Sequence, residues 1–264
     1  MNERPSILAS EKGKMEAYAH VIRALMLRDM RTRFGGSHWG YAVLVMWPVA
    51  HIFIMVAIMA FRAIPSPMGG SPFLFVSTAC VPVLTFQYMA REIMKGVIVN
   101  KPLLYYPQVK IFDVMIARIL VEIVKGFTCL SVVMSLLAAL GVNPIPEDPA
   151  MAIGAYCAAT LLGVGFGALN MGIVSFFPGW MLGWIIPQVL LYMTSGIFFL
   201  PSQLPNELYD ILKWHPLSQI VEWTRLAYDP SLAVDIDFTY VIMFGLTTLV
   251  LGLIMERTVV RRLS

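Results

Sequence analysis

Few side chains in this sequence have the types and spacing that chemistry requires, and the clearest group is a short run of charges. Arg118, Glu122 and Lys125 stand four and three residues apart. Side chains at this spacing share one face of a helix, where opposite charges neutralise one another. Because the run opens an otherwise apolar segment, it indicates neutralised charges near the end of a membrane helix.

No catalytic constellation accompanies these charges. The histidines lie in four separate regions, at His20, His38, His51 and His215. The cysteines, Cys80, Cys129 and Cys157, all lie in apolar stretches and form neither a disulfide framework nor a metal pattern. The glycine-rich P-loop motif for ATP is absent from the sequence. We therefore expect no enzyme activity, metal site or cofactor in this chain, and we expect another subunit to energise any transport.

Long uncharged stretches set the fold class. Five of them contain no Asp, Glu, Lys or Arg, namely Tyr41 to Phe61, Pro72 to Ala90, Ala150 to Phe177, Trp180 to Leu200 and Phe238 to Met255. A bilayer core about 30 Å thick requires roughly 20 helical residues, and each stretch is near that length. Residues 113–140 form a sixth, mixed stretch. The sequence predicts an all-α polytopic membrane protein with six transmembrane helices.

Composition and charge placement predict the location and orientation. The 264 residues are 58% hydrophobic and 13% charged, whereas soluble domains carry about 25% charged residues. Residues 1–40, 91–118 and 256–264 hold 15 of the 19 Lys and Arg residues. By the positive-inside rule, both termini and the 91–118 segment lie in the cytoplasm of a bacterium, under its inner membrane. The basic N-terminus favours contact with membrane lipids over nucleic acid, and no cleavable signal peptide is expected.

The remaining segments divide the chain into predicted regions. These are a disordered N-terminus (1–14), an interfacial amphipathic helix (15–36), a single six-span domain (37–256) and a cytoplasmic tail (257–264). Within the domain, a short cytoplasmic connection at about 95–107, bounded by Pro102 and Pro107, is predicted to form a short helix between spans 2 and 3. Between spans 5 and 6, residues 201–228 predict two short periplasmic helices, interfacial or re-entrant, because each is about half the length of a span.

Several motifs together resemble one family of membrane proteins. They are Leu27-Arg-Asp-Met-Arg-Thr-Arg-Phe34, Gly40-Tyr41, Pro48-Val-Ala-His51, Asn100 with Leu103-Leu104 and Pro107, Asp113 with Ile116-Ala-Arg118, and Trp214-x-Pro216-Leu217 with Val221-Glu222 and Arg225. This order, along with six spans, resembles the permeases of type-2 ATP-binding-cassette exporters, and within them the KpsM-like capsular-polysaccharide export permeases. The resemblance covers most of the chain.

The resemblance implies a transport subunit without its own ATP site. Two copies of a separate ATPase, which bind ATP and Mg, would act on two copies of this chain, and a periplasmic export partner is expected. The implied ATPase-coupling residues are Lys95, Gly96, Asn100, Lys101, Leu103, Leu104 and Tyr105. The implied cytoplasmic entrance holds Arg28, Arg31, Arg33 and Phe34. These arginines meet either the anionic end of a lipid-linked glycan or anionic headgroups.

Two further groups complete the expected sites. Aromatic faces suit a sliding sugar polymer, and the candidate translocation path is Tyr41, Trp47, Phe86, Tyr88, Trp184 and Tyr192, although Trp and Tyr also populate membrane interfaces. The periplasmic helices contribute Tyr209, Trp214, Pro216, Glu222 and Arg225. The expected cargo is lipid-linked capsular polysaccharide. Alternatives are O-antigen, teichoic acid or small lipophilic drugs, or, outside transport, a membrane scaffold or enzyme that is stable without a nucleotide-binding partner.

Overall fold

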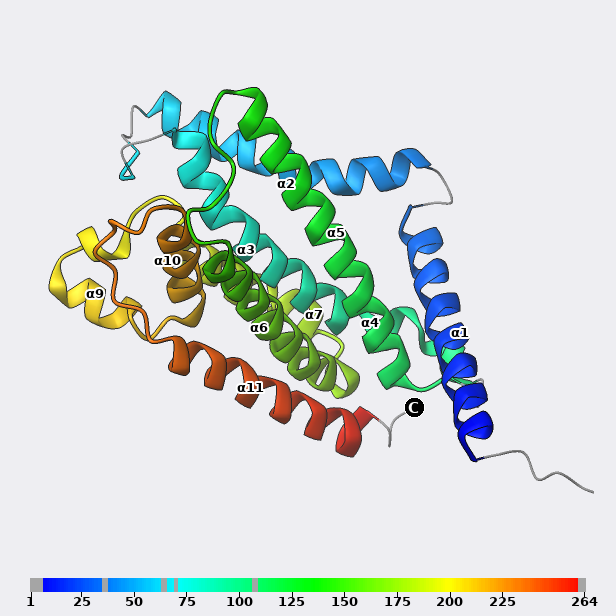
Figure 1. Ribbon diagram of the computed structural model, residues 1–264. Helices are drawn as coiled ribbons and strands as arrows, with labels where there is room; N and C mark the ends of the chain where they lie inside the picture. Colours follow the sequence, from blue (N-terminus) through cyan, green and yellow to red (C-terminus); the bar gives the residue numbers. More distant parts are fainter. Residues whose placement is uncertain (1–6, 35–37, 63–65, 69–70, 106–108, 261–264) are drawn as a thin grey trace, which may run out of the picture.

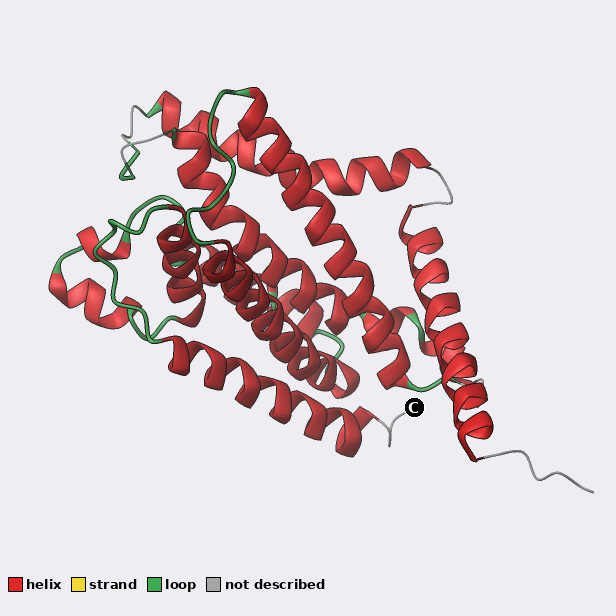
Figure 2. Ribbon diagram, in the orientation of Figure 1, coloured by secondary structure: helices red, strands yellow, loops and turns green. Residues whose placement is uncertain are grey.

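Helices make up almost all the regular structure of the computed structural model, which describes residues 7–34, 38–62, 66–68, 71–105 and 109–260 (Figure 1). No strand occurs among these residues (Figure 2). The α-helices are α1 (Ile7–Phe34), α2 (His38–Phe61), α3 (Pro72–Met94), α4 (Gly96–Val99), α5 (Ile111–Ala139), α6 (Pro149–Phe176), α7 (Trp180–Gly183), α8 (Ile185–Met193), α9 (Asn206–Leu212), α10 (Pro216–Tyr228) and α11 (Phe238–Met255). Short 3₁₀ helices cover Lys101–Tyr105 and Pro201–Gln203, and a π-helical turn, Glu256–Val260, follows α11.

Among the described residues, five helices are long and apolar enough to cross a membrane: α2, α3, α5, α6 and α11. Polar caps explain where three of them begin. The side chains of Ser71, Asp148 and Asp237 accept hydrogen bonds from backbone N–H groups in the first turns of α3, α6 and α11, which satisfies donors that have no partner within the helix. The all-helical class is confirmed, as are the predicted long helices at these five places.

The central helix is α3, with α6 packed along it. In the most apolar 18-residue stretch of α3, 83% of the residues are buried inside the protein. The corresponding share in α11, which lies on the outside, is 22%. Gly163 and Gly167 of α6 permit the close approach, since a Cβ on Gly163 would lie 2.8 Å from the Cβ of Met89 and one on Gly167 would lie 2.7 Å from the Cβ of Ile93. The Gly-x-x-x-Gly motif therefore faces α3.

The stretch predicted as a fifth span is helical over only part of its length. Its apolar helical portion runs from Trp180 to Met193 and is interrupted between α7 and α8, at Trp184. At about 1.5 Å per residue, this portion is shorter than a bilayer core of about 30 Å. Gly196 has φ 86°, a left-handed conformation that suits glycine and prevents helix from continuing toward Leu200.

The observed helix boundaries also differ from the predicted ones at the N-terminus and in the connection after α3. α1 begins at Ile7, earlier than the predicted start at Met15, so it includes part of the segment expected to be disordered. The predicted single helix between spans 2 and 3 is two short pieces, α4 and the 3₁₀ helix Lys101–Tyr105, because Pro102 supplies no backbone N–H for a continuous α-helix.

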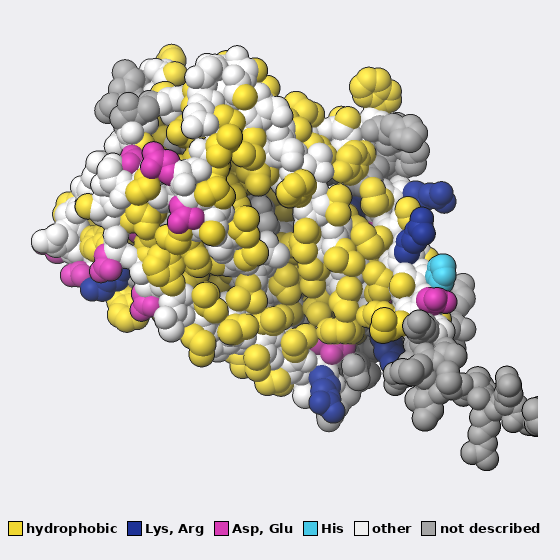
Figure 3. Space-filling view, viewed as in Figure 1, with side chains coloured by type: hydrophobic (Ala, Val, Ile, Leu, Met, Phe, Trp, Pro, Cys, Tyr) yellow, Lys and Arg dark blue, Asp and Glu magenta, His cyan; other side chains and the backbone are white. Residues whose placement is uncertain are grey.

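The outer surface of the long helices is strongly apolar. Side chains such as Phe127, Ile153 and Val250 are more than half exposed on α5, α6 and α11. Figure 3 shows hydrophobic side chains covering the face formed by these helices, with acidic side chains gathered at the end that carries α9. Such a face is costly in water and suits the hydrocarbon of a bilayer.

Candidate functional site

A buried charge cluster joins α1, α3 and α5. Its members lie on three helices that are far apart in the sequence: Asp29 and Arg33 on α1, Glu92 on α3, and Arg118, Glu122 and Lys125 on α5. Each of these side chains is at most 16% exposed. Buried charges require paired partners, and here each carboxylate has at least one cation. The cluster holds the N-terminal helix against the long helices.

Arg33 is the most connected member of the charge cluster. Its guanidinium lies 2.8 Å from Asp29 Oδ2 and 3.3 Å from Glu92 Oε2, and it donates a hydrogen bond to Glu122 Oε1. Burial alone lowers the pKa of Arg33, but the three carboxylates around it raise the pKa overall, so the guanidinium stays charged. Arg33 lies between helices, and the role expected of it at a cytoplasmic entrance stays a prediction.

Arg118 completes the cluster in a way that the sequence spacing did not predict. The expected partner one turn away was Glu122, but Nη2 of Arg118 lies 3.2 Å from Asp29 Oδ1, and Nη1 donates to the backbone carbonyl of Glu92. The predicted pairing of Glu122 with Lys125 is present. Contacts between helices therefore replace one of the two predicted contacts within a helix, because α1 brings a carboxylate against α5.

The segment after α3 contacts α1 beside the charge cluster. We call residues 95–107 the coupling segment. Arg28 of α1 donates a hydrogen bond of 3.0 Å to Oδ1 of Asn100, whose Nδ2 donates 3.0 Å to the carbonyl of Gly96. Lys95 Nζ lies 3.1 Å from Glu92 Oε1. One amide side chain thus connects α1 to α4, and Lys95, the first residue of the segment, pairs with Glu92 of the charge cluster.

The remaining residues predicted for ATPase coupling and for the cytoplasmic entrance do not share these contacts. Leu103 packs against the apolar side chains between α1 and α5, whereas Lys101 and Arg31 are exposed. The side chains of Leu104, Tyr105 and Phe34 lie outside the described part of the chain. Among the predicted coupling and entrance residues, the structure brings together Arg28, Arg33, Lys95, Gly96 and Asn100.

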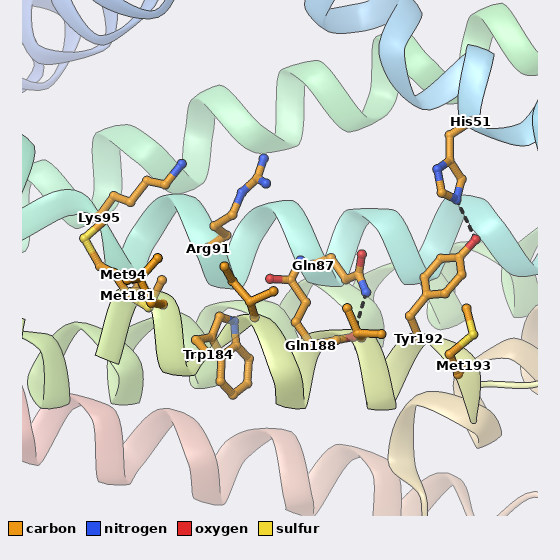
Figure 4. Close-up of a pocket in the computed structure, with 13 residues that line it drawn as sticks. His51, Gln87, Arg91, Met94, Lys95, Met181, Trp184, Gln188, Tyr192 and Met193 are labelled. Atoms are coloured by element: carbon orange, nitrogen blue, oxygen red, sulfur yellow. Dashed lines mark hydrogen bonds between the residues drawn. The ribbon is translucent and has the colours of Figure 1, made fainter. Parts of the chain in front are cut away.

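A cavity of about 550 Å³ lies between α3 and the α7–α8 pair (Figure 4). Arg91 and Lys95 lie at one end, and His51 and Tyr192 lie at the other, where His51 Nε2 and the Tyr192 hydroxyl are 2.5 Å apart. Between the ends, Gln87 Nε2 donates a hydrogen bond of 3.1 Å to the Gln188 carbonyl, and the remaining wall consists mostly of methionine and aliphatic side chains. We call this the Tyr192 cavity.

The predicted path residues separate into two sets. Trp184 and Tyr192 line the Tyr192 cavity. Phe86 is 1% exposed, and its ring contacts Phe166 in the core. Tyr88 lies on another side of α3, with the Lys125 ammonium 4.2 Å from its ring centroid. Of the residues outside the lining, Trp47 is 65% exposed and Tyr41 is partly buried. The six aromatics therefore do not form one continuous row.

The second predicted periplasmic helix, α10, is packed into the molecule. Arg225 is fully buried, donates hydrogen bonds to the carbonyls of Phe199 and Ile197, and lies 3.9 Å above the Phe75 ring. These carbonyls belong to the non-helical stretch after α8, so the guanidinium satisfies backbone groups that lack helical partners. Glu222 is also buried, and burial raises its pKa to about 7, against the opposing effects of Arg225 and the Ser202 backbone.

The first short helix, α9, is more exposed. Tyr209 is partly buried, and Trp214, just after α9, is 65% exposed with its ring against Tyr240 of α11. The Tyr240 hydroxyl donates a 2.7 Å hydrogen bond to the Trp214 carbonyl. Pro216 is buried at the first position of α10, where the missing N–H of proline has no cost.

Sequence reasoning missed several residues of these sites. Asp29 and Glu92 carry the charge cluster, and Gln87, Arg91 and Gln188 line the Tyr192 cavity. Glu92 had one available signal, since it is a single carboxylate between cations at the end of an uncharged stretch. The glutamines had none, because the facing of two helices decides which polar side chains meet.

Comparisons with known proteins give a consistent answer. No model of a known protein family matches the chain. The polysialic acid transport protein KpsM of Escherichia coli is 28% identical over 240 residues, covering 90% of this chain and 92% of the relative. The capsule polysaccharide export inner-membrane proteins CtrC of Neisseria meningitidis serogroup A and BexB of Haemophilus influenzae are 25% and 23% identical, with 88% and 93% of this chain covered. The expected likeness to KpsM-like permeases is confirmed.

Proposed function

We propose that this chain is the membrane-spanning permease subunit of an ATP-driven exporter that moves capsular polysaccharide across the bacterial inner membrane. The observation that carries the proposal is the likeness, over about nine-tenths of both chains, to inner-membrane proteins named for capsule polysaccharide export. Five long apolar helices agree with a multi-pass protein of that membrane. The subunit transports and does not catalyse.

We further propose six spans with both termini in the cytoplasm. The sixth crossing is the broken stretch from Trp180 to Leu200, in which the α7–α8 helices supply only part of the distance. Arg225 supports this assignment, because a non-helical backbone at membrane depth requires a partner for its carbonyls. The concentration of Lys and Arg near both termini and after α3 favours the same orientation.

The energy comes from two copies of a separate ATPase, which bind ATP and Mg and act on two copies of this chain. Their motion enters through the coupling segment. Two contacts support this role: the hydrogen bond from Arg28 to Asn100, and the ion pair of Lys95 with Glu92. Displacement of the segment would therefore move α1 and α3 together, and the charge cluster would carry that movement into α5.

The Tyr192 cavity is our candidate for part of the translocation path. Trp184 and Tyr192 line this cavity, each with only a small exposed part (5% and 6%), and aromatic side chains in the wall suit a sliding sugar polymer. Arg91 and Lys95 lie at the end next to the coupling segment, where they suit an anionic group of a glycan or its lipid linker. On the opposite side of the membrane, the exposed Trp214 region is a contact surface for a periplasmic export partner.

Reconstitution tests the proposal. The chain and its ATP-binding subunit are placed in liposomes, and ATP-dependent accumulation of lipid-linked capsular glycan is measured. We expect accumulation that fails in Trp184→Ala and persists in the control Phe176→Ala, whose aromatic ring is 58% exposed outside the cavity. No ATP-dependent accumulation when both folded subunits are present would contradict the proposal and favour a scaffold or an enzyme.

A further inference from the structure

A second hollow lies on the opposite, outward side of α3. We call it the α5–α6 groove: its walls are α5 and α6, its floor is α3, and its volume is about 510 Å³. Val81 and Thr85 form the floor, and Gly126 lies on the α5 wall. α5 packs mainly on α1 and α3, so it leaves α6 uncovered on this side. In Figure 1, α5 and α6 pass in front of α3.

The surroundings of the groove are apolar. Its three helices are all candidate membrane spans, so its mouth opens toward hydrocarbon and not toward water. Phe127 and Ile153 line the groove and are 71% and 64% exposed. The α6 wall, from Ile153 to Leu161, is about 12 Å long at 1.5 Å per residue, less than half of the bilayer core of about 30 Å. That length matches part of one acyl chain within one leaflet.

One end of the groove is polar. Glu122 lines it there, and the same carboxylate is bound to Arg33 and Lys125 of the charge cluster. An amphipathic molecule would therefore place its polar end toward the cluster and its apolar tail along the α6 wall. Glu122 is only 2% exposed and is already neutralised by Arg33 and Lys125, so the groove presents an almost wholly apolar lining, which suits an acyl chain better than a polar ligand.

Gly126 has no side chain to fill the groove, and the packing of α5 against α3 does not require a glycine at this position. A Cβ at this position would meet only Thr85 Oγ1, at 3.7 Å, which is an ordinary contact. This differs from Gly163, where a Cβ would clash with α3. A larger side chain at Gly126 would thus point into free space and fill the groove.

We propose that the α5–α6 groove binds the acyl chain of a membrane phospholipid. The bound chain fills the space between α5 and α6 and supports α5 on the side away from α1. Because α5 carries Arg118 and Glu122, the lipid and the charge cluster together fix the position of this helix.

Photo-crosslinking tests the site. The full chain in nanodiscs is irradiated with phosphatidylglycerol that carries a diazirine in the middle of one acyl chain, and adducts are mapped by mass spectrometry. We expect adducts to concentrate on Phe127 and Ile153, severalfold above Met243, a lipid-facing residue 56% exposed on α11. Gly126→Leu should reduce them to the level of Met243, whereas Gly126→Ala should preserve them.

Several results would overturn the proposal. Adducts spread evenly over the outer faces would show no site, and undiminished adducts in folded Gly126→Leu would place the lipid elsewhere. A cross-link between two copies through Cys157, which lines the groove and is exposed, would show a protein interface. Adducts formed only when lipid-linked glycan is present would indicate a site for the substrate tail. If Gly126→Leu does not fold, the groove of the wild-type protein can be filled by alkylating Cys157 with a bulky apolar maleimide, which must reduce the lipid adducts in the same way. The reagent is selective for Cys157 because Cys80 and Cys129 are buried.

Discussion

The hydrogen bond from Arg28 to Asn100 is the most specific link between the coupling segment and the rest of the chain. It is 3.0 Å long, and Asn100 is 7% exposed. A hydrogen bond to a charged group contributes about 1.5–3 kcal/mol, and the partial exposure of Arg28 favours the lower end of this range. A loss of about 1.4 kcal/mol corresponds to a tenfold change in an equilibrium. We therefore expect Arg28→Gln to lower the glycan transported per ATP hydrolysed by roughly tenfold.

A double-mutant cycle in the reconstituted transporter measures this contribution. Asn100→Ala should reduce transport per ATP at least as much, because it also removes the bond to the Gly96 carbonyl. Asn100→Asp keeps the acceptor for Arg28, so it should retain more coupling than Asn100→Ala. The combined Arg28→Gln and Asn100→Ala variant should be little worse than Asn100→Ala alone.

The matched control is Arg23→Gln, which alters an exposed arginine of the same helix. It should leave transport per ATP near the wild-type value. Two results would refute the reasoning: a double variant whose loss equals the product of the two single losses, or an Arg23→Gln loss as large as that of Arg28→Gln. Either would mean that the arginine acts through general positive charge at the membrane surface.

Three further predictions concern stability, measured by thermal unfolding of the purified protein in detergent. Arg33→Gln leaves three buried carboxylates with less neutralising charge, and it should lower the free energy of unfolding by only about 2 kcal/mol because neighbouring cations remain. The control Arg23→Gln, at an exposed position of α1, should change stability little. Equal stabilities of the two variants would contradict a buried charge cluster. Gly163→Leu should destabilise by roughly 1–3 kcal/mol by overpacking against α3, while Gly13→Ala, with no atom within 4 Å, should be neutral or stabilising. Between pH 4.5 and about 7, the folded state binds more protons at Glu222 than the unfolded state does, so stability should fall as pH rises through this window. Glu222→Gln should reduce that fall, and an unchanged pH profile would show that another group titrates.

The sequence predicted the long helices well because burial in lipid leaves a simple signal. Uncharged stretches of bilayer length marked α2, α3, α6 and α11 closely, whereas the polar N-caps that begin three of these helices were seen only in the structure. The stretch from Trp180 to Leu200 was harder, since its composition is equally apolar. Its helix ends where the backbone turns at Gly196, and hydrogen bonds from Arg225 compensate the lost helical bonds.

The sites were less predictable because they depend on contacts between helices. Helical spacing identified the Glu122–Lys125 pair, but it could not show that α1 brings Asp29 to Arg118. Aromatic content suggested a path, but only the arrangement of helices around α3 places Tyr192 in a cavity and Phe86 in the core against Phe166 of α6.

The most direct test of the central claim is the location of the capsular glycan in cells that lack this gene. Cells are fractionated, and glycan is assayed at the surface and in the cytoplasm. We predict glycan retained inside with none at the surface, and recovery when the wild-type gene is restored. Normal surface glycan in the deleted strain would contradict polysaccharide export by this chain and would direct the search toward O-antigen, teichoic acid or lipophilic drugs as cargo.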